Sequence, residues 1–457
     1  MRALLVAALL LTGIGAAAAD EIASLAGDWD GTLPTGRGVS LRMTLRVDSS
    51  DGKTTAYMVS LDQGGVKIPI AGIARDGDSV TFDAPTVQGS YSATLSRDGK
   101  TMTGRWAQRV TLPLTLTRRA EGAPDPAARR PQDPKPPYPY VIEDIVFDGP
   151  GGIRLAGTFI RPNRDGPFPA VVLIQGSGPF DRDEAMMGHR PFWVLADALA
   201  RQGIAVLRAD KRGVGKSGGD PKTATSRDFA ADTQAAIAYL KQVKTINPRR
   251  IGLIGHSEGG LIAPMVAAED PSVAFIVLMA GPGLKGEDIL DRQQRLIGQA
   301  MDVAPGALES ALALNRKLYA AVKSSTDSAG AKAKAEAVLE AAGVPAGKRA
   351  ASAAMAAMPW FRFFLDYDPV PALRQVRCPV LAINGSLDLQ VPPKEDLAAI
   401  GAALAGNPDT TILELPGLNH LFQTSKTGSP AEYAQIDETI APSVLALIGD
   451  WIRKHSK

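Results

Sequence analysis

The chain has little cysteine, histidine or aromatic residue, and no excess of either charge. Cys378 is the single cysteine among 457 residues, so no intrachain disulfide can form, and its apolar surroundings predict a small core residue. Lys and Arg number 50 against 48 Asp and Glu, a net charge of +2 that leaves no basic footprint for nucleic acid. Aromatic residues make up 5%, which gives no sugar-stacking signature.

Long apolar runs are also missing, except at the N-terminus. Residues 1–19 combine Arg2, an apolar run over residues 3–12 and the small residues Ala17 to Ala19. This pattern is typical of a secretory signal peptide cleaved near Ala19, and its apolar core is too short for a comfortable membrane span. We therefore expect an exported protein, periplasmic or secreted, with no membrane span in the mature chain.

Changes in composition predict three regions after the signal peptide. Residues 20–118 contain short, partly alternating apolar runs between Gly, Asp and Ser turns, which predicts a small antiparallel β domain with Trp29 in its core. Residues 119–139 are rich in proline and have no apolar period, as in a semi-rigid linker. Residues 140–457 would form the third region.

The third region alternates apolar runs with helical patterns. Two leading segments, "YVIEDIVF" and "IRLAGTFIRP", resemble a hairpin, and six near-continuous apolar runs follow, such as "RIGLIGH" and "PVLAING". Runs of this kind are typical of strands buried on both faces, so we predict an α/β fold with a mostly parallel sheet and helices on both faces. Residues 283–368 are helical and Ala-rich, which favours an inserted cap over a long crossover.

The motif "GHSEG" at residues 255–259 fits G-x-S-x-G between a predicted strand and a predicted helix. This context favours a nucleophile elbow that presents Ser257, with the backbone N–H of Glu258 facing the reacting centre. A competing glycine pattern, "GVGKSGG" at 213–219, lacks the first glycine of a Walker loop and the acid of a dinucleotide site. We interpret it as a loop that shapes the flank of the site.

The chain has four histidines, so the search for a catalytic base is short. His455 lies near the C-terminus, His256 is the neighbour of the serine, and His189 precedes it but could line the site. Nucleophile-elbow enzymes order their residues serine, acid, histidine, which favours His420 in the loop after the last predicted strand. The alternative for His420 is a structural role, in which this loop histidine caps the last helix.

Asp388 is the best candidate for the acid, because it directly follows a buried strand between Ser257 and His420. Glu395 and Asp396 are rivals that we expect to cap the following helix. The second oxyanion donor is expected in "QGSGP" at residues 175–179, from the backbone N–H of Ser177 or of Gly178, together with that of Glu258.

These segments together resemble the α/β-hydrolases, and more narrowly the EstD-type bacterial carboxylesterases, which join a small N-terminal β domain to a capped hydrolase domain. The resemblance covers roughly residues 140–457 through "GSGPFDRD", "DKRGVGKSGG", "GHSEGG", "NGSLDLQVP" and "GLNH". It implies Ser257 as nucleophile, Asp388 as acid and His420 as base. It also implies ester hydrolysis through an acyl-enzyme, with no metal or cofactor, on a small-molecule ester.

Gln175 departs from this family, because many hydrolases have histidine before the oxyanion glycine. Other functions stay open: a serine peptidase or aminopeptidase of the same fold, a thioesterase or a lactonase, and a non-enzymatic envelope binding module. A prolyl oligopeptidase would need an N-terminal propeller, for which about 100 residues are too few. The oligomeric state is open, and a homo-oligomer is possible.

Overall fold

The computed structural model describes residues 21–36, 39–50, 53–61, 66–108, 110–123 and 130–456. The predicted signal peptide lies outside these residues. No helix of the described chain is long and apolar enough to cross a membrane. By its contacts the chain divides into two compact units. The first holds the described residues up to Arg130 together with Met186–His189, and the second holds Pro131–Ala185 and the chain from Arg190 on.

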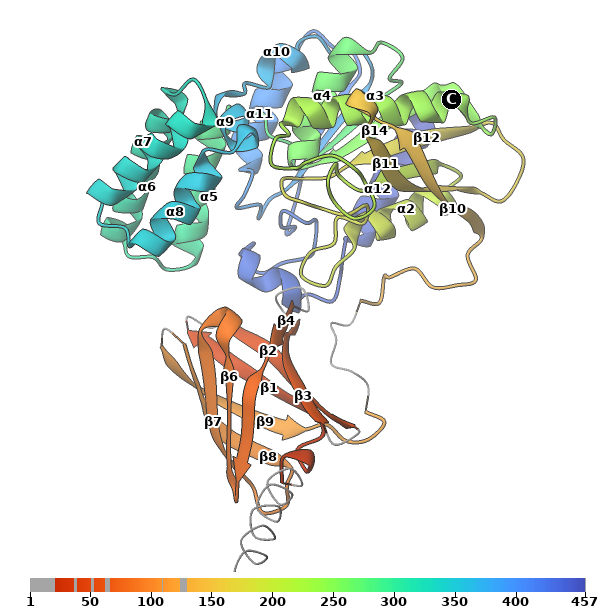
Figure 1. Ribbon diagram of the computed structural model, residues 1–457. Coiled ribbons are helices and arrows are strands. Elements are labelled where there is room, and N and C mark those ends of the chain that lie inside the picture. The colour runs from red at the N-terminus through yellow and green to blue at the C-terminus, as the bar shows by residue number, and fades with distance from the viewer. Residues whose placement is uncertain are drawn as a thin grey trace, which may run out of the picture. The chain divides into compact units, whose positions relative to one another are not determined.

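The first unit is a nine-stranded antiparallel sheet in the order β4-β3-β2-β1-β9-β8-β7-β6-β5 (Figure 1). Its strands are β1 (Gly27–Gly36), β2 (Val39–Ser50), β3 (Lys53–Ser60), β4 (Val66–Pro69), β5 (Ala71–Asp76), β6 (Ser79–Ala84), β7 (Gly89–Leu95), β8 (Thr101–Ala107) and β9 (Thr111–Arg118). Alternate residues of the strands point into one core, which Trp29, Phe82 and Tyr91 fill. Trp29 is fully buried, as the sequence predicts for this residue.

The second unit has an eight-stranded sheet in the order β10-β11-β13-β12-β14-β15-β16-β17. Its strands are β10 (Tyr140–Asp148), β11 (Arg154–Pro162), β12 (Phe168–Ile174), β13 (Ala205–Ala209), β14 (Ile246–His256), β15 (Ile276–Met279), β16 (Val380–Gly385) and β17 (Thr410–Leu415). β10 and β11 pair antiparallel, as the predicted hairpin does, and the six strands from β12 to β17 pair parallel with one another.

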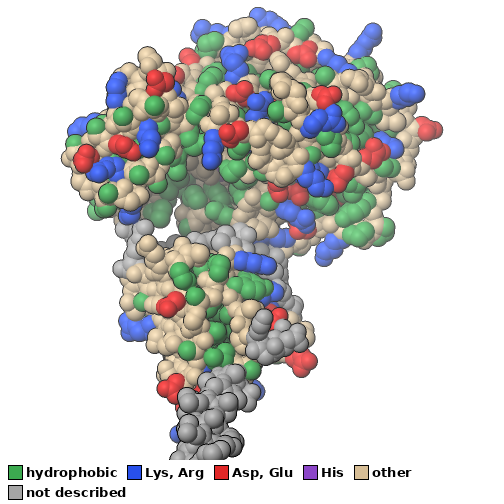
Figure 2. Space-filling model, viewed as in Figure 1, with side chains coloured by type: hydrophobic (Ala, Val, Ile, Leu, Met, Phe, Trp, Pro, Cys, Tyr) green, Lys and Arg blue, Asp and Glu red, His purple; other side chains and the backbone are tan. Residues whose placement is uncertain are grey.

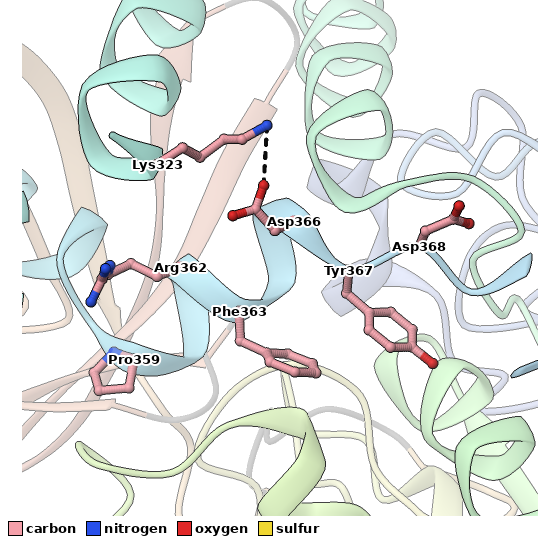
Figure 3. Close-up of a pocket in the computed structure, with 7 residues that line it drawn as sticks. All are labelled: Lys323, Pro359, Arg362, Phe363, Asp366, Tyr367 and Asp368. Atoms are coloured by element: carbon pink, nitrogen blue, oxygen red, sulfur yellow. Dashed lines mark ion pairs between the residues drawn. The ribbon is translucent and has the colours of Figure 1, made fainter. Parts of the chain in front are cut away.

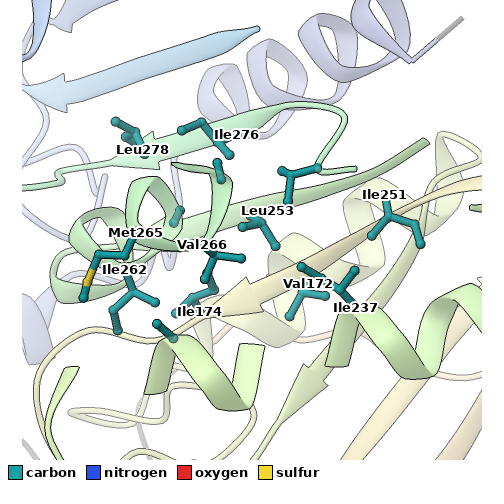
Figure 4. Packing of buried hydrophobic residues seen from close by; sticks show 14 of the residues in the cluster. Val172, Ile174, Ile237, Ile251, Leu253, Ile262, Met265, Val266, Ile276 and Leu278 are labelled. Atoms are coloured by element: carbon teal, nitrogen blue, oxygen red, sulfur yellow. The ribbon is translucent and has the colours of Figure 1, made fainter. Parts of the chain in front are cut away.

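Helices cover both faces of this sheet. They are α2 (Pro191–Arg201), α3 (Ser226–Gln242), α4 (Glu258–Glu269), α11 (Pro393–Ala403) and α12 (Pro442–His455). On one face Val172 packs with Ile237 of α3 and Val266 of α4 (Figure 4). The next residue of β12, Val171, points to the opposite face and packs with α2 and α12. Near-continuous apolar strands follow from this double burial, which confirms the predicted α/β fold class.

Five helices stand between β15 and β16, in the interval where the sequence predicts an inserted cap. They are α5 (Gly286–Ala300), α6 (Pro305–Lys323), α7 (Ser328–Ala341), α8 (Ala346–Ala356) and α9 (Pro359–Asp366), and the short α10 (Val370–Leu373) leads back to the sheet. They have a small core of their own, which includes Leu318, Val322, Ala335 and Leu339. Lys, Arg, Asp and Glu are interspersed over the visible surface of the second unit, with no patch of one sign (Figure 2).

Asp396 does not cap α11, contrary to the sequence-based expectation. The N-cap residue of α11 is Pro392, and no side chain caps the helix. Asp396 Oδ1 instead accepts hydrogen bonds from the backbone N–H groups of Gly283 (2.7 Å) and Leu284 (3.1 Å), at the start of the cap insertion. Its Oδ2 is buried without a hydrogen-bond partner in the described chain. Burial raises the pKa of Asp396 to about 7, although the two N–H donors act to lower it.

The raised pKa of Asp396 predicts a pH-dependent stability. The folded protein binds a proton more tightly than the unfolded chain, so stability is present below about pH 4 and is lost as the pH rises to about 7. In Asp396→Asn the amide stays neutral, and this loss disappears. We expect the Tm of Asp396→Asn minus the Tm of wild type to increase from about pH 4 to about pH 7. This increase corresponds to a change of a few kcal/mol in the free energy of unfolding. A difference in Tm that stays constant over this range would contradict the assignment.

Candidate active site

Ser257 lies in a sharp turn between β14 and α4. Its φ of +53° and ψ of −118° are strained for a residue with a side chain. Glycine is required on both sides of this turn: a Cβ at Gly255 would lie 1.9 Å from Gly259 O, and one at Gly259 would lie 2.0 Å from Ile174 O. The turn therefore has the geometry of a nucleophile elbow, with the N-terminus of α4 directly behind the serine.

Asp388 and His420 follow the neighbouring strands β16 and β17 and meet at the same edge of the sheet. His420 Nδ1 lies 2.7 Å from Asp388 Oδ2, and both side chains are buried. Asp388 Oδ1 accepts the backbone N–H groups of Gln390 (2.7 Å) and Val391 (2.9 Å), which fixes the carboxylate. His420 Nε2 has no hydrogen-bond partner in the described chain, Ser257 Oγ included, so this nitrogen is available to take a proton.

His256 lies against His420, with a ring-centroid distance of 4.9 Å. Its Nδ1 lies 3.1 Å from Glu184 Oε1, and its Nε2 lies 3.0 Å from the backbone oxygen of His420. Burial acts to lower the pKa of His256, but the charge and hydrogen bond of Glu184 outweigh it and raise the pKa above its usual value. His256 thus holds the loop of His420 in place.

The loop after β12 lies beside the elbow. A Cβ at Gly176 would lie 3.1 Å from Ser257 Cβ. The N–H of Gly176 donates to Glu184 Oε1 (2.6 Å), and its carbonyl accepts from Lys211 Nζ (2.6 Å), so this peptide is held from both sides. The N–H groups of Ser177 and Glu258 donate to no other group of the described chain, which leaves both free to bind a substrate oxygen.

Gln175 and Gly178 lie on either side of Gly176 and Ser177 in the loop after β12. The Gln175 amide is buried and donates to the backbone oxygens of Ala209 (2.5 Å) and Asp181 (3.1 Å), so it shapes the loop. Gly178 has a φ of +124°, and a side chain there would meet the ring of Phe180. A glycine is therefore needed at the exit of the loop.

The remaining histidines have other surroundings. His455 stacks on Trp451 of α12 and lies 3.3 Å from Asp409. His189 belongs by its contacts to the first unit. No three His, Cys, Asp or Glu side chains of the described residues come together to hold a metal ion.

Sequence reasoning missed the role of two charged side chains beside the loop, those of Glu184 and Lys211. Both are buried, and each contacts the Gly176 peptide. The signal available for Lys211 is its place two residues after the end of β13, at the edge where the other candidate site residues gather. Glu184 carries no such signal, because nothing in the sequence distinguishes it from the other charged residues of the "DRDEA" turn, which are only partly buried.

Two cavities border helix α9. The first, of about 270 Å³, lies beside the loop after β12 and is lined by Gly178, Pro179, Lys211, Arg212, Val214, Pro221, Lys222, Phe229, Met358 and Trp360. The second, of about 510 Å³, contains an ion pair of 3.1 Å between Lys323 and Asp366, and the rings of Phe363 and Tyr367 (Figure 3). Gly178, the residue after the proposed oxyanion donor Ser177, lines the first cavity and not the second.

An elbow serine after β14, with further polar loops after β12, β16 and β17, defines the α/β-hydrolase fold of a serine hydrolase. The family model of the X-Pro dipeptidyl-peptidases (S15 family) matches residues 148–408, which is more than half of the chain. The chain belongs to this family. The matched range includes Ser257 and Asp388 and ends before His420.

Among curated proteins, the chain is similar to the esterase EstD of Thermotoga maritima, with 28% identity over 299 residues. This alignment covers 65% of the present chain and 64% of that esterase. Among solved structures, it is similar to the α/β-hydrolase GrgF of Penicillium, with a TM-score of 0.46, 19% identity and coverage of 69% and 99% of the two chains. The esterase Pf2001 of Pyrococcus furiosus has a TM-score of 0.43, 16% identity and coverage of 69% and 93%.

The Glu184–His256 pair predicts a second pH dependence. Because the folded pKa of His256 is raised, the pair stabilises the fold below about pH 6.5, and this contribution is lost as the pH rises through the folded pKa. In Glu184→Gln the amide oxygen can still accept from Gly176, but the charge is gone. We expect the free energy of unfolding of Glu184→Gln to be about 3 kcal/mol lower than that of wild type at low pH. This difference should become smaller toward high pH, as measured by denaturant unfolding.

Glu143→Gln is the matched control, because Glu143 pairs with Arg161 at 3.2 Å on the surface. It should change the free energy of unfolding by less than about 1 kcal/mol. A loss in Glu184→Gln that does not vary with pH would contradict a charged pair.

Proposed function

We propose that the protein is a serine carboxylesterase that hydrolyses small or short-chain acyl esters. Ser257 is the nucleophile, His420 the general base and acid, and Asp388 the residue that orients His420. The observation that carries this proposal is the buried contact of 2.7 Å between His420 Nδ1 and Asp388 Oδ2, at the sheet edge that holds Ser257. A carboxylate in this place selects the tautomer in which Nε2 accepts a proton.

The reaction has two halves. His420 Nε2 takes the hydroxyl proton as Ser257 Oγ attacks the ester carbonyl, and the negative charge on the former carbonyl oxygen is stabilised by the N–H groups of Ser177 and Glu258. The imidazolium gives its proton to the departing alkoxide, which leaves an acyl-enzyme. Water then loses a proton to His420 and attacks the acyl carbon. The bond from the acyl carbon to Ser257 Oγ breaks, the imidazolium returns its proton to Oγ, and the carboxylic acid and the free serine are released.

The volume and lining of the first cavity suit a small apolar acyl group. Its volume of about 270 Å³ is slightly below the range of roughly 300–1,000 Å³ common for small-molecule sites. Val214, Phe229, Met358 and Trp360 line it. The name of the Thermotoga relative, an esterase, supports the same substrate class.

Cleavage of X-Pro dipeptides is the second candidate, because the family model carries that description. Such a substrate has an N-terminal ammonium group close to the bond that is cleaved. The charged residues that line the first cavity are Lys211, Arg212 and Lys222, and no carboxylate is among the described lining residues. Lys211 pairs with Glu258 and Arg212 with Asp232, so the cavity wall offers an ammonium group no free carboxylate to bind, which supports the ester over the peptide.

A substrate panel tests the proposal. We expect turnover of p-nitrophenyl acetate and butyrate, weaker turnover of the octanoate, and little release of p-nitroaniline from Gly-Pro-p-nitroanilide. Ser257→Ala should lower kcat on the butyrate by a factor on the order of 10⁴ or more, and Asp388→Asn by about 10⁴.

Ser310→Ala is the matched control, because Ser310 is exposed on α6. It should keep the wild-type rate. Ester turnover that survives in Ser257→Ala would remove the proposed nucleophile. Turnover of the dipeptide anilide without turnover of esters would replace the esterase by the peptidase.

A further inference from the structure

The buried side chain of Glu258, next to the nucleophile, binds three other side chains. It is 1% exposed, although it carries a charge and follows Ser257 directly. Glu258 Oε2 lies 3.1 Å from Lys211 Nζ, while Oε1 accepts hydrogen bonds of 2.6 Å from Ser226 Oγ and from Trp360 Nε1. A buried carboxylate with three such partners is fully compensated, and removal of one partner is costly.

The three partners come from separate parts of the second unit. Lys211 follows β13, Ser226 begins α3, and Trp360 belongs to cap helix α9. Lys211 Nζ also donates to the carbonyl of Gly176, in the loop that supplies the proposed oxyanion donor Ser177. A continuous set of polar contacts therefore runs from the cap through Glu258 and Lys211 to the oxyanion loop.

Trp360 also forms part of the wall of the first cavity. It lines this cavity together with Met358 of the cap and Gly178 of the oxyanion loop. The Trp360 ring stacks on Phe364, with centroids 5.4 Å apart and an angle of 22° between the planes, and Phe364 is buried in the main core. The ring is thus held by stacking on one side and by its N–H bond to Glu258.

We propose that Trp360 determines the acyl-chain length that the enzyme accepts, and that Glu258 and Lys211 are positioning residues that link the seating of Trp360 to the oxyanion loop. This inference rests on the proposed esterase function. The ring limits the space for the acyl chain, and its hydrogen bond to Glu258 keeps the Lys211 ammonium directed at Gly176 O. Correct seating of the cap would then support the geometry on which oxyanion stabilisation depends.

The second cavity is a weaker candidate for the site that binds the acyl chain. It lies along the same helix, but its Lys323 and Asp366 pair with each other (Figure 3). None of its described lining residues contacts the elbow or the oxyanion loop by a hydrogen bond or ion pair. It provides the control for the experiment, because Phe363 lines it and belongs to α9, like Trp360.

The test compares three variants on p-nitrophenyl acetate, butyrate, octanoate and decanoate. Trp360→Ala should open the cavity and raise the ratio of kcat/KM on octanoate to that on acetate by about tenfold or more. Trp360→Phe keeps a ring but loses the N–H donor, so we expect the wild-type chain-length ratio with kcat lowered about tenfold on every ester and KM little changed. Phe363→Ala should keep the wild-type ratio.

A second readout separates this inference from the esterase proposal. An alkyl fluorophosphonate forms a bond from Ser257 Oγ to phosphorus and releases fluoride, so its labelling rate reports the nucleophile and oxyanion donors without an ester. Trp360→Phe should label about tenfold more slowly than wild type, whether or not esters are the substrate. The circular dichroism spectrum of each variant checks that it is folded.

Two outcomes would overturn the inference. One is a chain-length ratio in folded Trp360→Ala equal to that of wild type. The other is a labelling rate and kcat in Trp360→Phe equal to those of wild type, which would mean that the contact with Glu258 does not reach the oxyanion loop. A wild-type protein that is labelled by the fluorophosphonate but turns over no ester would instead refute the esterase proposal.

Discussion

The close approach of three backbone segments at Ser257 is the constraint on which the site depends. Gly255 is the penultimate residue of β14 and Gly259 lies in the first turn of α4, and neither position has room for a Cβ atom. Gly259 also lies against the end of β12, so α4 and the loop that follows β12 must start side by side. A serine with positive φ is strained, and the dense packing of β12, β14 and α4 is what maintains it.

Two buried carboxylates lie beside this turn, and of their four oxygens only Glu184 Oε2 has no hydrogen-bond partner in the described chain. Glu184 and Glu258 are both carboxylates with almost no exposure, and each reaches the Gly176 peptide, one directly and the other through Lys211. Burial of a lone carboxylate is expensive, and each of these has a cationic or hydrogen-bonding partner. The same contacts that offset the cost of burial also fix the peptide next to the proposed oxyanion donors, so electrostatics and geometry cannot be separated here.

The fold class and the positions of the candidate triad could be predicted from sequence because they depend on local patterns. Apolar runs mark strands buried on both faces, and a loop directly after such a strand lies at one edge of the sheet, which places Asp388 and His420. The contacts of Glu258 could not be predicted in this way. Its partners Lys211 and Trp360 are 47 and 102 residues away in the chain, and no periodicity links them. Asp396 was misplaced for the same reason, since its partners Gly283 and Leu284 are more than 110 residues distant.

The arrangement of His256 and His420 explains why the histidine next to the serine is not the proposed base. Both rings are buried and adjacent, and each lies against a carboxylate. In His256 both nitrogens are engaged, one with Glu184 and the other with the backbone oxygen of His420. In His420 only Nδ1 is engaged, so Nε2 can exchange a proton with Ser257 or with water. The difference lies in a single backbone carbonyl, which occupies His256 and at the same time positions the loop of the histidine that is free to react.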